Sequence, residues 1–70
     1  MNETLIGDRG MLGDEMLTAE EVAKIMKVHI TTVRKWIRNN ELKVVEIGVR
    51  EYRIRRSELD RFIQERERKA

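Results

Sequence analysis

The sequence contains no cysteine and no proline, and it has one histidine and three aromatic residues among its 70 residues. Without cysteine the chain can form neither disulfides nor thiolate metal sites, and a single histidine excludes a histidine-rich zinc site. We therefore expect no cofactor and no metal. Stability must come from aliphatic packing and from helix caps, because a chain of this length buries a small share of its surface.

Long apolar segments and catalytic groups are also scarce. No apolar run approaches the roughly 20 residues of a membrane-spanning helix, and no signal-peptide pattern opens the chain. The one serine stands where a helix is expected to begin, acid pairs occur only near helix starts and in the first 16 residues, and no glycine-rich phosphate loop is present. We expect no enzyme, no membrane partner and no small-molecule ligand.

What the chain does have is an uneven distribution of charge. The overall net charge is +2, yet residues 24–56 carry ten Lys and Arg against three Glu, a net charge of +7. Residues 1–23 have a net charge of −5, and residues 57–70 are balanced. A small domain with one strongly basic central segment is suited to bind a polyanion, and nucleic acid is the favoured polyanionic partner. This predicts a cytoplasmic, nucleoid-associated protein.

The first part of the chain divides into a leader and a helix. Residues 1–16 are rich in glycine and acids without a lasting period, so we predict a disordered leader. Thr18 and Glu21 fit the S/T-x-x-E capping box, which predicts a helix that begins there and ends near Met26 or Lys27.

A second helix is predicted over residues 30–39, and its two faces differ. At 100° per residue the apolar side chains Val33, Trp36 and Ile37 share one face, which assigns Trp36 to packing rather than to base stacking. The opposite face carries Thr31, Arg34, Lys35 and Arg38. Because only residues 28 and 29 separate the two helices, they must cross steeply, as in a helix-turn-helix, and the polar face is left free for a groove.

The rest of the domain is predicted to be a hairpin and a third helix. Residues 44–47 and 52–55 alternate with a period of two around a tip at 48–51, and Tyr52 is assigned to the half-buried face. The tip and outer face carry Arg50, Arg53 and Arg55. Ser57 is the expected N-cap of the third helix, whose stripe of Leu59, Phe62 and Ile63 closes the core. We predict a domain over residues 17–65 and a frayed tail at 66–70.

The ordered set of motifs resembles the excisionase-type DNA-binding domains, a branch of the MerR-like winged helix-turn-helix family. The matching residues are Leu17-Thr18, Glu20-Glu21-Val22-Ala23, Val28, Thr32-Val33, Trp36-Ile37, Glu41-Leu42, Ile47-Gly48, Tyr52-Arg53-Ile54, Arg56-Ser57, Leu59 and Phe62. The resemblance implies a mainly α fold with a small β-hairpin, in the order helix, turn, helix, wing, helix. It also implies that residues 30–39 enter the major groove and that a wing over residues 44–55 contacts backbone and minor groove.

Carried over by position, the resemblance names seven DNA-binding residues: Thr31, Arg34, Lys35, Arg38, Arg50, Arg53 and Arg55. The chain departs from the family pattern at four places. Lys27 stands where glycine is usual, which predicts a turn that is strained or differently shaped. Lys43 stands where proline is common, and the wing is one residue longer than the common form. His29 replaces a serine, which weakens that cap; an exposed turn residue near phosphate is the favoured interpretation, and a pH-sensitive DNA contact and a substitute cap are the alternatives.

Together these features predict a small, sequence-specific protein that binds double-stranded DNA. Its role would be that of an excisionase-like architectural factor or a transcriptional regulator, and its partners an integrase or recombinase, or neighbouring copies of itself on DNA. The alternative is a protein-interaction module whose basic face docks an acidic partner protein. RNA is disfavoured, because recognition of single strands relies on exposed aromatic side chains.

Overall fold

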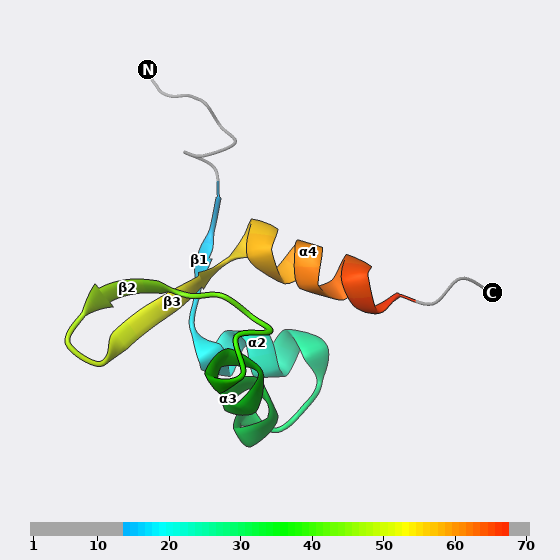
Figure 1. Cartoon of the computed structure of the whole chain (residues 1–70), viewed down its shortest axis with the longest axis horizontal. Helices are drawn as coiled ribbons and strands as arrows, with labels where there is room; N and C mark the ends of the chain where they lie inside the picture. The colour runs from blue at the N-terminus through cyan, green and yellow to red at the C-terminus, as the bar shows by residue number, and fades with distance from the viewer. Residues whose placement is uncertain (1–13, 68–70) are drawn as a thin grey trace, which may run out of the picture.

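The computed structural model describes residues 14–67. Along the chain the elements are β1 (Met16–Leu17), α2 (Ala19–Met26), α3 (Ile30–Arg38), β2 (Val45–Gly48), β3 (Glu51–Arg55) and α4 (Arg56–Arg66). The antiparallel sheet has the order β1-β3-β2, so the long hairpin of β2 and β3 extends away from the helices as a wing (Figure 1). This arrangement of three helices and a small hairpin confirms the predicted winged helix-turn-helix.

Helix α2 begins and ends as its sequence predicts, with strain at its end. The Thr18 amide donates to Glu21 Oε1 at 2.8 Å, and the Glu21 amide donates to Thr18 Oγ1 at 3.0 Å, which completes the capping box. Lys27 then adopts φ 58° and ψ 46°. This left-handed conformation suits glycine and costs a side-chain-bearing residue about 1 kcal/mol, so the expected strain in the turn is confirmed.

The start of α3 shows that His29 is both exposed and the cap of the helix. Its Nδ1 accepts a hydrogen bond from the Thr31 amide at 3.2 Å and lies 3.0 Å from Thr31 Oγ1. His29 therefore acts as the substitute N-cap, with extended backbone at φ −73° and ψ 151°. At the other end of α3, Asn39 is the C-cap and Asn40 takes the left-handed conformation at φ 62°.

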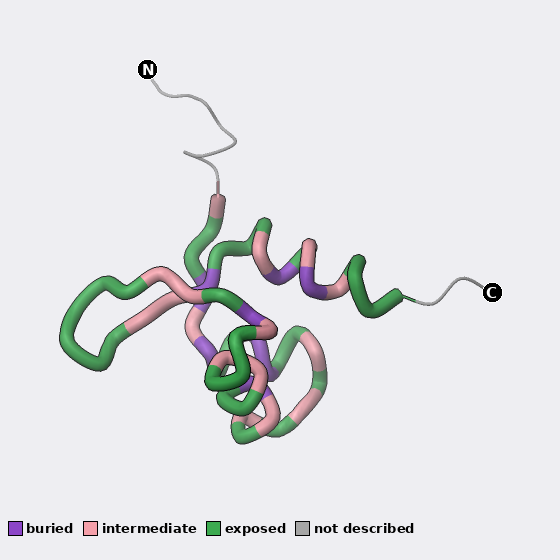
Figure 2. The backbone as a smooth tube through the Cα atoms, viewed as in Figure 1, coloured by how far each residue is buried: buried purple, intermediate pink, exposed green. Residues whose placement is uncertain are grey.

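The core lies where the helices meet the inner ends of the strands (Figure 2). Its buried members are Leu17, Ala19, Val22, Ala23, Val33, Leu42, Ile54, Leu59 and Phe62. Trp36 and Tyr52 pack against this core as half-buried residues, which confirms both assignments. The ring centroids of Trp36 and Phe62 are 4.7 Å apart, so α3 and α4 are joined through an aromatic pair.

The predicted N-cap of α4 is wrong. Ser57 is the second residue of the helix, because β3 runs into α4 without a loop and leaves Arg55 at the cap position with no side-chain cap. Asp14 supplies the missing acceptor: its Oδ1 accepts from the Ser57 amide at 3.0 Å, and its Oδ2 accepts from Ser57 Oγ at 2.7 Å. An acid 43 residues upstream therefore caps the helix and faces its positive end.

Two predicted boundaries also need correction. The predicted disordered leader extends too far, because Met16 pairs with Arg55 in the sheet and the Glu15 carbonyl accepts from the Arg56 amide at 2.8 Å. Residues 1–13 of that leader lie outside the described part of the chain. The predicted frayed tail begins too early, because Arg66 is the last residue of α4 and pairs with Glu41. Residues 68–70 are again outside the description.

Asp14→Asn is expected to lower the urea midpoint of unfolding at neutral pH, because the variant loses a charged acceptor at the start of α4. The Ser57 hydroxyl and amide, and then Arg55, hold the pKa of the Asp14 carboxyl below its ordinary value of 3.8. Its stabilisation is therefore fully present above pH 3.8 and is lost as the pH falls through the lower, folded-state pKa. The exposed neighbour Glu15 provides the control: Glu15→Gln should keep the parent midpoint. Equal midpoints for Asp14→Asn and parent would contradict the cap.

Candidate nucleic-acid interface

The polar face of α3 lies open to solvent. Thr31, Arg34, Lys35 and Arg38 are all exposed, whereas Val33 on the opposite side is fully buried. Within residues 14–67 no carboxylate forms an ion pair with the three basic residues of this face. Their guanidinium and ammonium groups therefore keep their donors available for a ligand.

The wing brings further arginines to the same side. Arg50 lies in the turn between β2 and β3 at φ 60°, and the Arg53 Nη1 donates to the Tyr52 carbonyl at 2.9 Å. Arg34, Arg50 and Arg53 line one hollow of about 350 Å³ between α3, the wing and the start of α2. Glu20 and Glu51 also line this hollow, so its charge is mixed, with three arginines against two glutamates.

The seven residues predicted to bind DNA lie in three different parts of the structure. The structure brings Arg34, Arg50 and Arg53 together around the hollow, and it keeps Thr31, Lys35 and Arg38 on the exposed face of α3. Arg55 lies apart from them, at the junction of β3 and α4. Its Nη1 is 3.6 Å from Asp14 Oδ2, so this side chain already has a carboxylate partner within the domain.

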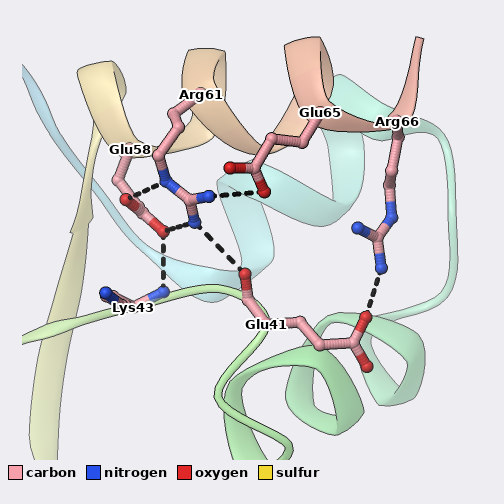
Figure 3. A network of polar contacts seen from close by, with 6 residues as sticks. All are labelled: Glu41, Lys43, Glu58, Arg61, Glu65 and Arg66. Atoms are coloured by element: carbon pink, nitrogen blue, oxygen red, sulfur yellow. Dashed lines mark hydrogen bonds and ion pairs between the residues drawn. The ribbon is translucent and has the colours of Figure 1, made fainter.

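The sequence patterns do not predict a polar network that joins α4 to the segment between α3 and β2 (Figure 3). Glu58 Oε2 accepts from the Lys43 amide at 2.9 Å, and Glu58 Oε1 accepts from Arg61 Nε at 2.9 Å. Arg61 also donates to the Glu41 carbonyl at 3.3 Å, and its Nη1 lies 2.7 Å from Glu65 Oε1. Helix α4 therefore fixes the backbone of the connection between α3 and β2, which sets where the wing begins.

The electrostatics of this network favour the charged forms of Glu58 and Arg61. The hydrogen bond from Arg61 lowers the pKa of Glu58, and the hydrogen bonds to Glu58 and Glu65 raise the pKa of Arg61. The spacing of three and four residues along α4 could have indicated these pairs. No local sequence pattern indicates the hydrogen bonds between α4 and the backbone of residues 41 and 43, because these partners are 20 and 15 residues apart in the chain.

A second link holds the end of α3 against α4. The Glu41 side chain pairs with Arg66. The Arg66 guanidinium in turn lies over the Phe62 ring at 4.0 Å and the Trp36 ring at 5.7 Å from its centroid. These cation–π contacts cover the aromatic pair, and the ion pair gives the Glu41 carboxylate a basic partner on α4.

Among the described residues no group of three or more His, Cys, Asp or Glu could hold a metal ion, and no helix is long and apolar enough to cross a membrane.

The architecture and its exposed basic second helix define a helix-turn-helix DNA-binding domain. A family model described as a helix-turn-helix domain matches residues 16–67, which is 52 of the 70 residues. The chain belongs to this excisionase-type helix-turn-helix family and is a small protein that binds double-stranded DNA. Comparison with curated proteins and with solved structures gave no match.

Proposed function

We propose that this protein recognises a specific sequence in double-stranded DNA, with α3 in the major groove and the wing on the adjacent backbone and minor groove. The observation that carries the proposal is the shared hollow: Arg34 of the exposed α3 face lines it together with Arg50 and Arg53 of the wing. A helix of about 10–12 Å diameter fits the major groove, which is about 12 Å wide. A hairpin beside that helix then reaches the neighbouring phosphates.

The exposed residues of α3 suggest separate roles. Arg34 and Arg38 can each donate two parallel hydrogen bonds to O6 and N7 of guanine, so we assign base reading to them. Lys35 has a single charged head group and suits a phosphate, whereas Thr31 can contact a phosphate or a thymine methyl group. Arg50 and Arg53 are assigned to phosphates, and Arg55 to a phosphate only if it leaves Asp14.

The biological role that follows is that of an excisionase-like architectural factor or a transcriptional regulator at the nucleoid. A single small module offers a limited interface to DNA, so occupancy would rise if adjacent copies or an integrase or recombinase bound beside it. The proposal includes no catalytic step, since domains of this family act by binding.

Selection of bound duplexes from a random pool tests the proposal. We expect an enriched motif that contains at least one guanine, in keeping with arginine readout. The matched control is a variant in which Arg34, Lys35 and Arg38 are all alanine, and it should return no motif. Binding without any enrichment would contradict sequence specificity. Failure to retain duplex DNA, together with capture of an acidic protein, would instead favour the protein-interaction function.

A further inference from the structure

The tip of the wing carries an apolar side chain that the fold does not use. Val49 is 91% exposed, compared with 38% for Met16, 42% for Ile25 and 50% for Ile47, the other exposed large apolar residues of the described chain. Single apolar residues on a surface are common and need no explanation by themselves. The position of this one is unusual, because it lies in the turn at the far end of the hairpin (Figure 1).

The two residues at this turn are also unusual for a tight hairpin. Tight hairpin turns favour glycine, asparagine and aspartate, yet the two turn positions here hold Val49 and Arg50. Arg50 adopts φ 60°, a conformation that a side chain disfavours, and the strand pairing is irregular between Glu46 and Gly48. Residues that are unfavourable for a turn and that also make no packing contacts are typical of functional sites.

The charges beside Val49 indicate what the tip meets. Arg50 is its neighbour in the chain, and Arg50 and Arg53 line the hollow that Arg34 of α3 also lines. Glu20 and Glu51 also line this hollow, so the tip stands at the end of a surface on which three arginines outnumber two acids. Proteins that bind the minor groove combine arginine side chains with apolar wedges that enter between base steps and partly unstack them.

We propose that Val49 is such a wedge: when α3 occupies the major groove, the wing tip enters the minor groove, Val49 inserts at a base step and Arg50 contacts the flanking phosphate. The proposal rests on the proposed function, because α3 must first place the wing. Pyrimidine–purine steps unstack most easily, so the inserted step should belong to this class. The wedge would then make the bound DNA kinked at that step.

The test uses the full chain and one duplex cloned from the bound pool, with 2-aminopurine replacing one adenine at a time. We expect the parent to raise 2-aminopurine fluorescence at one step near the end of the site. Val49→Thr keeps the branched shape of valine but makes it polar, and exposure of the side chain leaves folding unaffected. This variant should lose the fluorescence increase and bind about five- to tenfold more weakly, with an unchanged salt slope.

Three further variants separate the explanations. Val49→Ile should restore the parent signal, and Ile25→Thr should leave it unchanged, because Ile25 is an exposed apolar residue on α2 away from the hollow. Arg50→Ala should reduce the salt slope while the bound complex keeps the fluorescence increase.

If Val49→Thr keeps the affinity and the fluorescence increase of the parent, the wedge is overturned and the proposed function is not. A loss of self-association in that variant, without a change in fluorescence, would also overturn the wedge by assigning the tip to a second copy. A parent that binds no duplex would overturn the proposed function and the wedge with it.

Discussion

Phe62→Ala is expected to leave the domain marginally stable and partly unfolded in water at 25 °C. Phe62 is fully buried, its ring packs against Trp36 of α3, and the guanidinium of Arg66 covers it. Removal of a buried phenylalanine ring costs about 3–5 kcal/mol, whereas a domain of this size has a total stability of about 5 kcal/mol. Far-UV circular dichroism should show loss of helix, and the fluorescence of Trp36 should move to the red as its ring enters water.

Two milder variants show that the loss comes from the contact between α3 and α4. Phe62→Leu keeps an apolar side chain in the core and should stay folded with a lower urea midpoint. Ile63→Ala removes a half-buried neighbour from the same helix and should cost less than Phe62→Ala. A Phe62→Ala protein with the parent midpoint would show that the aromatic pair does not hold the second helix in place.

Arg34→Ala is expected to lower affinity for the selected site by about 1–3 kcal/mol, or roughly fivefold to 150-fold, and to relax specificity at one base position. The side chain is exposed and has no ion pair within residues 14–67, so the fold should survive its removal. The bidentate donors of the guanidinium are lost, and the guanine that they read becomes interchangeable with other bases. Repeating the selection with the variant measures this change directly.

Two other arginines serve as references for Arg34→Ala. Arg50→Ala should weaken binding to all sequences by a similar factor, because a phosphate contact carries no sequence information. Arg56 is exposed on α4, pairs with Asp60 and lies outside the hollow, so Arg56→Ala should bind DNA as the parent does. If Arg34→Ala returns the parent motif, the assignment of the recognition face is wrong.

Local features of the sequence predicted where α2 begins and which face of α3 lies exposed. The capping box of Thr18 and Glu21 and the two faces of α3 depend on residues within one or two helical turns, where sequence spacing translates directly into geometry. The strained turn at Lys27 was indicated by the family resemblance, because the family pattern usually has glycine at this position. These features place the basic face of α3 toward solvent before any tertiary contact is known.

The supports of that surface could not be predicted in the same way. The cap that Asp14 provides for Ser57 spans 43 residues, and the bond from the Lys43 amide to Glu58 spans 15. Neither side chain shows a period or motif that points to its partner, since the contact exists only after the sheet and α4 are assembled. The pairing of Arg55 with Asp14 has the same origin, and it separates this residue from the other wing arginines.

Fluorescence anisotropy of the full chain on a random-sequence duplex, across a salt series, tests most directly whether the basic surface of α3 and the wing binds DNA. About five phosphate contacts should give a log–log slope of affinity against salt of roughly −4 to −5. Alanine at both Arg50 and Arg53 should reduce that slope by about 2. Absence of binding at low salt, or the parent slope in the double variant, would contradict the assignment of this surface to DNA.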